Sequence, residues 1–335
     1  MKYLSIIIPS YNTESFIDKN MKTFIDERLF NDVEIILVND GSKDNTAKKA
    51  AEYEALYPGF VRFIDKENGG HGSVINRGIK EATGRYYKVI DADDWVDTDN
   101  LVLLVERLKV SNVDLVLNPY IKIHQVTNET KTCSVFPPDM VEKNISFEDF
   151  QNRGIGLALH SITIKTSILR DNGISLTEKC FYEDFQYTLY PVPYIKTVML
   201  LNFPVYYYLV GQKSQSVSAI SGLKNMGMYI KVFKDSVKYY DKVSGNFSKE
   251  LKKYMEDEIC KYLRSMYNIF LRNDSTTVIR NAMLVADKEI AEISPYFYKR
   301  VGKKNPYIKV LRYGSCMFFK VVSFVFKKYK SKEIS

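Results

Sequence analysis

This chain of 335 residues has little cysteine and no long apolar run. Its four cysteines lie far apart and form no Cys-x-x-Cys pair, which argues against a zinc site and against a disulfide framework. The longest candidate for a membrane span, residues 317–326, is short and is interrupted by Lys320. The first residues lead directly into the strand-like run 4–8, so we expect no secretory signal peptide and a cytoplasmic protein.

Two common nucleotide-binding fingerprints are also missing. The glycine-rich segment 67–73 matches neither the Gly-x-Gly-x-x-Gly pattern of dinucleotide-binding proteins nor the P-loop of ATPases. A dehydrogenase and a P-loop ATPase are therefore disfavoured. A phosphate ligand remains compatible with this segment, because it precedes a helix-like stretch and free amides at a helix start favour anions.

Positive charge is scarce outside the C-terminal region. The net charge is +8, but residues 299–335 hold 11 Lys and Arg against one Glu, and the first 298 residues have a net charge of −2. This distribution disfavours nucleic acid as a partner and favours contact between the tail and an anionic surface.

The tail is predicted to form one basic, amphipathic helix that begins at Asn305-Pro306. At about 100° per residue, five basic residues share a sector of roughly 80°: Lys309, Arg312, Lys320, Lys327 and Lys330. We expect peripheral contact with an anionic membrane through 305–335. The alternative is a terminal helix docked on the protein with its lysines in solvent.

Strand-like and helix-like segments alternate through the first 110 residues. Apolar runs at 4–8, 33–38, 61–64 and 86–90 are separated by helix-compatible segments at 15–27, 45–57 and 72–82. This alternation predicts βαβ units, a mostly parallel sheet and a ligand crevice at the carboxyl ends of the strands.

The pattern changes after about residue 113. A hairpin is predicted over 120–136, a helix over 183–190, and strands over 198–201 and 205–209, and helical spacing dominates after about residue 222. We therefore predict a catalytic α/β domain over 1–220 and a helical extension over 221–335.

An acidic cluster, Asp91-Ala92-Asp93-Asp94, follows the strand-like run 86–90. Carboxylates this close repel one another unless a cation intervenes, and Mg²⁺ or Mn²⁺ prefers oxygen ligands that it shares with phosphates. Two interpretations remain open for the residues alone. One is a metal-bridged diphosphate site; the other is a solvated turn in which Asp97 or Asp99 caps the next helix.

Three further polar motifs follow the other predicted strands: Pro9-Ser10-Tyr11-Asn12, Asn39-Asp40-Gly41-Ser42, and Asn68-Gly69-Gly70. An aromatic ring at a strand end can stack on a base, and a carboxylate can accept from a base N–H. Each motif taken alone is equally well explained as a turn or a helix cap.

The order of these four motifs resembles the family 2 glycosyltransferases of the GT-A fold, which have a Rossmann-like, mostly parallel central sheet. The resemblance implies a nucleotide-sugar donor, usually a UDP-sugar, held with Mn²⁺ or Mg²⁺. It places Pro9 and Tyr11 beside the uracil and pairs Asp40 with it. It also implies that Asp93, with Asp91 or Asp94, contacts the ribose and the metal-bound diphosphate, and that Asn68, Gly69, Gly70 and Asn76 line the donor site.

One departure concerns the helix after the glycine-rich loop. Many relatives have Ala-Arg-Asn where this chain has Val74-Ile75-Asn76. Any diphosphate contact of that arginine must therefore come from Lys213 or Arg77. Lys213 as a solvated loop lysine is the alternative.

Glu183-Asp184, at the start of a predicted helix, resembles the acidic pair of the family. The resemblance makes Asp184 the base and Glu183 a supporting group; the alternative is an acidic helix start stabilised by the helix dipole. His160 is a candidate for the acceptor cleft and His71 lies beside the phosphate loop, although lone histidines are more often structural.

Together these features predict an inverting glycosyltransferase that moves a sugar to a hydroxyl of a glycan or lipid-linked glycan in cell-surface polysaccharide synthesis, at the inner face of the membrane. One alternative is a catalytically silent nucleotide-sugar-binding or scaffolding subunit. A nucleotidyltransferase is weaker, because its first loop would be rich in glycine and lysine. The sugar, the acceptor and a homodimeric state are left open.

Overall fold

The alternation predicted for the first half is confirmed in the computed structural model, which describes residues 2–211, 219–274, 276–313 and 318–334. The strands are β1 Leu4–Ser10, β2 Val33–Asp40, β3 Val61–Lys66 and β4 Tyr86–Val89. The helices between them are α1 Ile17–Lys22, α2 Thr46–Leu56 and α3 His71–Glu81. The predicted helix over 15–27 is too long, because the hydroxyl of Thr23 bonds the carbonyl of Asn20 and competes with the helix.

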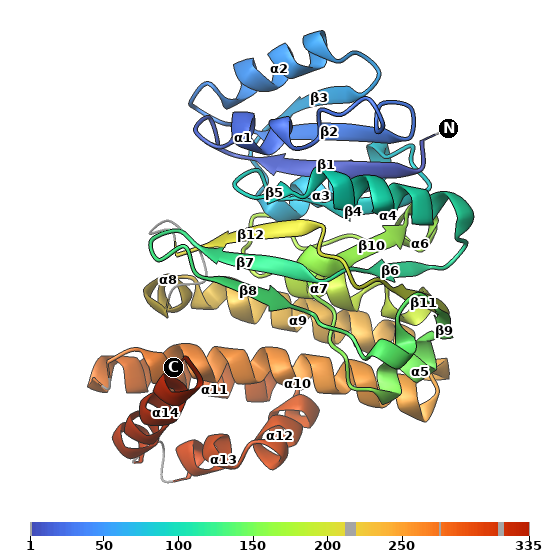
Figure 1. Cartoon of the computed structure of the whole chain (residues 1–335). Coiled ribbons are helices and arrows are strands. Elements are labelled where there is room, and N and C mark those ends of the chain that lie inside the picture. Colours follow the sequence, from blue (N-terminus) through green and yellow to red (C-terminus); the bar gives the residue numbers. More distant parts are fainter. Residues whose placement is uncertain (1, 212–218, 275, 314–317, 335) are drawn as a thin grey trace. The chain divides into compact units, whose positions relative to one another are not determined.

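The large sheet has the strand order β3-β2-β1-β4-β10-β6-β11-β9, and its first four strands are parallel. Figure 1 shows β3, β2 and β1 side by side. Their carboxyl ends therefore meet at one edge, where all four polar motifs begin. The predicted α/β class with a mostly parallel sheet is confirmed. The remaining strands are β6 Leu115–Leu117, β9 Asn144–Ser146, β10 Ile162–Lys165 and β11 Thr197–Leu200.

A second sheet has the order β5-β12-β7-β8. It consists of β5 Trp95–Val96, β12 Tyr206–Val210, β7 Tyr120–His124 and β8 Thr130–Cys133. The predicted hairpin is confirmed, since β7 and β8 pair antiparallel with Ile123 opposite Thr130. Four helices complete this part: α4 Thr98–Val110, α5 Phe147–Asn152, α6 Thr166–Asp171 and α7 Asp184–Leu189.

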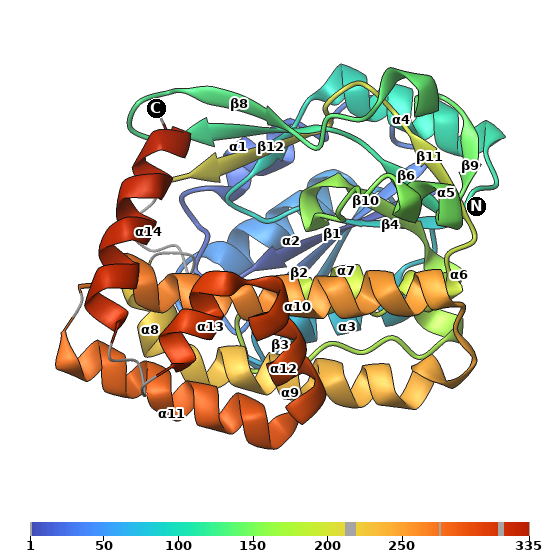
Figure 2. The ribbon, with the colours of Figure 1, turned by 90° about the horizontal axis from the view of Figure 1, so that it is seen from below.

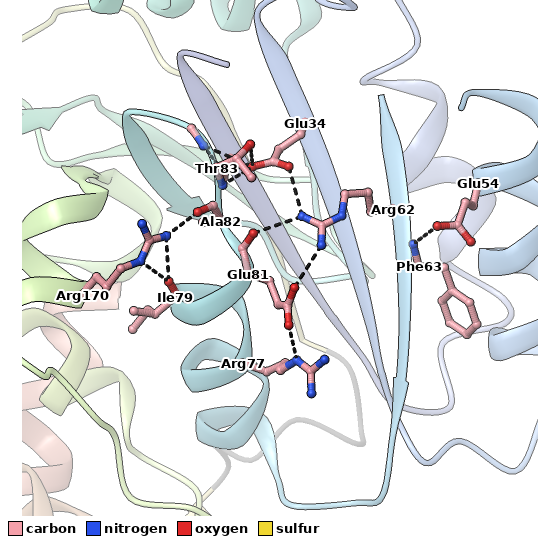
Figure 3. A network of polar contacts seen from close by, with 12 residues as sticks. Glu34, Glu54, Arg62, Phe63, Arg77, Ile79, Glu81, Ala82, Thr83 and Arg170 are labelled. Carbon is pink, nitrogen blue, oxygen red and sulfur yellow. Dashed lines mark hydrogen bonds and ion pairs between the residues drawn. The ribbon is translucent and has the colours of Figure 1, made fainter. Parts of the chain in front are cut away.

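Two arginines hold the C-terminal end of α3 (Figure 3). Arg62 of β3 donates to the carbonyl and the carboxylate of Glu81, both at 3.0 Å, and pairs with the buried Glu34 of β2. Arg170 of α6 donates to the carbonyls of Ile79 and Ala82. Cations at this end satisfy the last carbonyls and complement the helix dipole. The position of α3 is thereby set from two sides.

The chain divides into two units, Met1–Lys213 and Ser214–Ser335. The second unit is helical, and Figure 2 shows its long helices α9, α10 and α11, which pack on one another. Its described helices are α8 Ala219–Lys224, α9 Met226–Val243, α10 Lys249–Arg272, α11 Thr277–Ile293, α12 Pro295–Lys304, α13 Pro306–Arg312 and α14 Phe319–Ile334. Among the helices described, none is long and apolar enough to cross a membrane.

The prediction of one basic helix over 305–335 is wrong in two respects. Helix α13 ends at Arg312, because the backbone of Tyr313 is extended, and α14 begins at Phe319. Arg312 also points inward, because its guanidinium pairs with Asp287 at 2.9 Å and bonds the hydroxyl of Tyr267. A partly buried cation with a buried carboxylate partner does not contribute to a solvent-facing basic stripe.

Candidate active site

The residues predicted to border a nucleobase lie at the carboxyl end of β1. Pro9 is buried within the strand opposite Val38, whereas Tyr11 has 49% of its surface exposed. Asn12 adopts a φ of 52° and accepts from the amide of Lys43, which ties this loop to the one after β2. Tyr11 is thus the ring that is available for stacking at this edge.

The carboxylate of Asp40 organises the glycine-rich loop. It accepts from the amide of Gly69 at 2.9 Å, the amide of Gly70 at 2.8 Å and the ammonium of Lys66 at 2.6 Å. Asn68 closes the same loop by donating to the carbonyl of Asp40 at 2.8 Å. Asp40 is 3% exposed. Contact with a base would have to share a carboxylate that already accepts these three bonds.

Two polar residues of α3 are engaged elsewhere in the fold. The amide of Asn76 is buried and exchanges hydrogen bonds with the backbone of Leu176, and it also donates to Glu178. Arg77 pairs with Glu81 one turn later, Nε to Oε1 2.9 Å. Asn76 therefore fixes the chain segment that leads to Glu183. The other candidate for a diphosphate contact, Lys213, lies outside the described residues.

The acidic cluster is held by contacts from α1 and β12. The hydroxyl of Tyr206 donates to Asp94 Oδ2 at 2.6 Å and accepts from the amide of Asp91 at 3.1 Å. The amide of Leu209 donates to Asp94 Oδ1 at 2.7 Å, and Asn20 donates to the carbonyls of both aspartates. The turn between β4 and β5 is consequently rigid.

The two ends of this cluster differ in charge behaviour. Burial, with the nearby charges of Asp91 and Asp93, raises the pKa of Asp94 well above its usual value. Burial opposes ionisation of Asp91 as well, but the hydrogen bond and charge of His71 prevail and lower the pKa of Asp91. Asp91 is therefore the ionised carboxylate next to a cation, and a bound metal ion would favour the ionised form of Asp94.

A set of possible metal ligands does form at this turn. Carboxylate oxygens of Asp91 and Asp94 and a ring nitrogen of His160 all lie within 4.8 Å of one another. Burial lowers the pKa of His160 to about 4, so its ring is neutral. Oxygen and neutral imidazole ligands fit Mn²⁺, and Mg²⁺ less well because of the nitrogen. Asp93, which the resemblance also places at the metal-bound diphosphate, is partly exposed and is not among these possible ligands.

Three tyrosines fix the ring of His160. It stacks on Tyr208 and Tyr120, with ring centroids 4.2 and 4.9 Å apart, and meets the edge of Tyr206 at 4.8 Å. Tyr206 and Tyr208 point the same way because alternate residues of a strand share a face. In a strand, Tyr206 and Tyr208 of the run Tyr206-Tyr207-Tyr208 are expected on one face. That was the sequence signal for the aromatic surroundings of His160, and sequence reasoning missed it.

Glu183 and Asp184 lie at the start of α7, after a strained residue. Tyr182 adopts a φ of 74°, a conformation that costs a bulky residue about 1–3 kcal/mol. The side chain of Glu183 is 3% exposed and that of Asp184 is 58% exposed. The backbone thus buries the first carboxylate and presents the second to solvent.

Asp184 has the properties of a base near neutral pH. Partial burial raises the pKa of Asp184 to about 7, the charges of Glu183 and Asp91 add to the rise, and His71 opposes it. Because much of the side chain is exposed, solvent screening limits this shift. A carboxylate with a raised pKa and an open face is suited to accept a proton.

His71 joins the acidic turn to the Glu183-Asp184 pair. Its Nδ1 lies 2.8 Å from Glu183 Oε1 and its Nε2 lies 3.0 Å from Asp91 Oδ1. Asp184 Oδ1 is 3.8 Å from the same Nδ1. Burial opposes protonation, but the bonds to Asp91 and Glu183 outweigh it and raise the pKa of His71 well above its usual value.

The sequence over residues 5–173 matches the model of glycosyl transferase family 2. The chain belongs to this family. The predicted resemblance is thus confirmed, and the four strand-end motifs described above fall inside the matched region.

Two curated relatives illustrate how far the family likeness extends. An uncharacterized glycosyltransferase, EpsJ of Bacillus subtilis, is 39% identical over 113 residues, which cover 34% of this chain and 32% of EpsJ. The teichoic acid poly(glycerol phosphate) polymerase of Staphylococcus epidermidis is 30% identical over 210 residues, which cover 62% of this chain and 28% of the polymerase. The matches therefore span about a third or less of these relatives.

The fold likeness covers nearly the whole chain. TarS 1-349 of S. aureus, solved in complex with UDP-GlcNAc, superposes with a TM-score of 0.68 at 17% identity, covering 98% of this chain and 92% of that one. A mannosyltransferase from Pyrobaculum calidifontis, PcManGT, solved with GDP-Man and Mn²⁺, gives a TM-score of 0.50 at 15% identity. The family 2 chain therefore has the predicted GT-A fold with a C-terminal helical part.

Proposed function

We propose that this family 2 chain is an inverting glycosyltransferase that moves a sugar from a UDP-sugar to a hydroxyl of a glycan or lipid-linked glycan acceptor. The observation that carries the proposal is the convergence at His71 of Asp91, from the donor motif, with Glu183 and Asp184. Residues 71, 91 and 183 come from three different segments and form one hydrogen-bonded cluster. A mere binding subunit has no need of a base beside its donor site.

In the proposed reaction Asp184 accepts the proton of the acceptor hydroxyl. The acceptor oxygen forms a bond to the anomeric carbon while the bond from that carbon to the diphosphate oxygen breaks, and UDP leaves with the electron pair. Attack from the face opposite UDP inverts the configuration, so no covalent enzyme intermediate is needed. Tyr11, which is 49% exposed at the end of β1, would stack on the uracil.

The residues fit a divalent cation at the acidic turn. Asp91, Asp94 and His160 would hold it. When bound, the cation offsets the negative charge that develops on the leaving diphosphate. The chain's own contribution is to keep the turn rigid through Tyr206 and Asn20.

The support for a UDP-sugar comes from the fold. TarS was solved with UDP-GlcNAc, and PcManGT with GDP-Man, so the fold accepts more than one nucleotide. Teichoic acid synthesis in a curated relative supports a cell-surface polymer as the product class. We propose the inner face of the cell membrane as the site of action.

The decisive experiment compares wild type with Asp184→Asn. Purified protein is incubated with Mn²⁺ and a panel of nucleotide sugars, with and without glycan acceptors, and nucleoside diphosphate release is measured. The amide cannot take a proton, so we expect turnover to fall by about 10³-fold or more while UDP binding persists. Full activity of the folded variant would refute the base assignment.

The same assay separates the proposal from its main alternative. A catalytically silent binding or scaffolding subunit would bind the nucleotide sugar and release no UDP, even by slow hydrolysis. Glu148→Gln is the matched control, because this acidic residue lies in the first turn of α5, is exposed and is not part of the cluster. Its turnover is expected to equal that of wild type.

We also propose that α14 contacts an anionic membrane. Phe324 and Val325 lie one turn after Val321 on α14, and the three residues have 68%, 59% and 62% of their surfaces exposed. Lys327 and Lys328 lie further along the same helix and are exposed. An apolar face next to cations matches the boundary between acyl chains and anionic headgroups.

A further inference from the structure

The ring of His71 lies between two carboxylates that belong to different parts of the proposed machinery. Both ring nitrogens face an ionisable oxygen at hydrogen-bond distance, Nδ1 to Glu183 at 2.8 Å and Nε2 to Asp91 at 3.0 Å. Carboxylates only accept when ionised, so each bond uses a ring N–H as its donor. The ring is therefore a two-ended link, and neither end is left for substrate.

Glu183 depends on this link. Its side chain is 3% exposed, His71 is its ion-pair partner, and its other oxygen, Oε2, has no hydrogen-bond partner among the described residues. A buried carboxylate without a compensating cation costs several kcal/mol. The strained backbone of Tyr182 directly precedes it, so the loop has no intrinsic preference for this conformation. The carbonyl of Glu183 accepts from the amides of Gln186 and Tyr187, and the bond to His71 is what holds its carboxylate.

The support under His71 is rigid. His71 is the first residue of α3, and Arg62 and Arg170 donate hydrogen bonds to carbonyls at the C-terminal end of this helix. The next residue, Gly72, has no room for a side chain, since a Cβ there would come within 2.5 Å of the carbonyl oxygen of Thr177. The backbone at the start of α3 therefore cannot shift toward either carboxylate, and the position of the His71 ring is fixed with it.

We propose that His71 is a positioning residue that sets the distance between the donor site and the base. Through Glu183 it fixes the start of α7, and so the carboxylate of Asp184, relative to Asp91. This inference rests on the proposed function. Displacement of a reacting group by about 1 Å is enough to cost roughly 10²-fold in rate.

The expected signature is a loss of kcat with little change in KM for the donor. The amide of Asp91 still donates to the hydroxyl of Tyr206 when His71 is removed, so the turn of the donor site stays formed. In His71→Ala we expect kcat to fall about 100-fold and the donor KM to stay within about threefold. Since the ring is 25% exposed, added imidazole can enter the vacated space and is expected to restore at least a tenth of kcat.

His71→Asn supplies a second, more conservative variant. Its amide can take the place of Nδ1 beside Glu183, but it is too short to reach Asp91. We expect its kcat to lie at least tenfold above that of His71→Ala. This variant also carries the test if the alanine variant fails to fold, which circular dichroism and a thermal melt establish for each protein.

The control is His124→Ala. His124 ends β7, and its ring nitrogen accepts from the amides of its own turn at residues 126 and 127. Its removal is expected to leave kcat and KM unchanged and to give no response to imidazole.

Three outcomes would overturn the inference: folded His71→Ala with kcat within threefold of wild type, a donor KM that rises in step with the loss of kcat/KM, or a loss that imidazole does not relieve. The proposed function is tested separately by Asp184→Asn. If that variant is inactive while His71→Ala is fully active, only the positioning role fails; if both are fully active, the base assignment fails as well. The proposed function itself fails only if wild type releases no nucleoside diphosphate from any nucleotide sugar.

Discussion

At the scale of single residues, the burial of Lys88 is the feature that is hardest to predict from the sequence. It sits in the middle of β4, in a run that reads as apolar, and is 0% exposed. Its ammonium donates to the carbonyls of His160 and Ile162, each at 3.1 Å, and no carboxylate pairs with it among the described residues. Burial lowers the pKa of Lys88 to about 7. Lys88 therefore links β4 to the turn that carries His160.

This pKa predicts how the stability of the protein depends on pH. An unfolded lysine has a pKa of about 10.4, so between pH 7 and pH 10 the unfolded state holds a proton that the folded state has released. Stability therefore rises with pH in this window, and below about pH 7 the full cost of burying the charge is present. The free energy of unfolding of wild type, relative to Lys88→Met, should rise by about 1 kcal/mol per pH unit from pH 7.5 to 9.5. Urea unfolding at each pH measures it, and a flat difference would show that Lys88 keeps its proton in the folded state.

At the scale of elements, the acidic turn and β12 form one structural unit. The turn is local in sequence, but what holds it comes from 112 to 115 residues further along the chain, through Tyr206 and Leu209. Asp94 is 1% exposed and accepts both of these bonds. The turn that would hold the donor is thus built from two elements that no local pattern connects.

We therefore expect Tyr206→Phe to destabilise the protein. Loss of the hydroxyl leaves a buried carboxyl oxygen of Asp94 and the amide of Asp91 without this partner, at a cost of about 1–3 kcal/mol. Tyr207→Phe is the matched control, because its hydroxyl lies 3.4 Å from Asp97, a long and weak contact. Its effect is expected to stay within about 0.5 kcal/mol in the same urea titration. Equal effects of the two substitutions would contradict the structural role of Tyr206.

At the scale of the whole molecule, charge and apolar surface are unevenly distributed between the two units. The last 37 residues hold 11 of the 48 basic residues and one of the 40 acidic ones. Arg312 is used inside the helical unit, so the solvent-facing cations come from exposed residues such as Lys309, Lys320, Lys327 and Lys328. Three of them, Lys320, Lys327 and Lys328, lie on α14 together with its exposed apolar residues.

This arrangement predicts that wild type binds vesicles of phosphatidylserine and phosphatidylcholine more tightly than vesicles of phosphatidylcholine alone. Phe324→Glu should weaken binding to the anionic vesicles by about tenfold or more, because it places a negative charge in the apolar face. Val285→Glu is the control, since Val285 of α11 is 68% exposed but lies outside this region. Cosedimentation at low and high salt measures the partition. Equal binding of wild type to both kinds of vesicle would rule out the electrostatic part of the proposal.

Much of the fold followed from local pattern. The run of Leu4–Ser10, then α2 and α3, were predicted within two or three residues because apolar periodicity and turn residues act over one element at a time. The split of the tail into α13 and α14 was missed, since a helical wheel continues through any segment and takes no account of whether Arg312 has a buried partner.

The sequence by itself determined the family, the parallel sheet and the edge at which its motifs meet, because parallel strands place their carboxyl ends together whatever the loops do. The tertiary structure alone decided which side chains touch. In the folded chain Asp40 accepts from the amide of Gly69, and Asp94 accepts from the hydroxyl of Tyr206. His71 lies between Asp91 and Glu183. These contacts join residues that are between 20 and 112 positions apart, and only the packing of the chain brings such residues within hydrogen-bond distance.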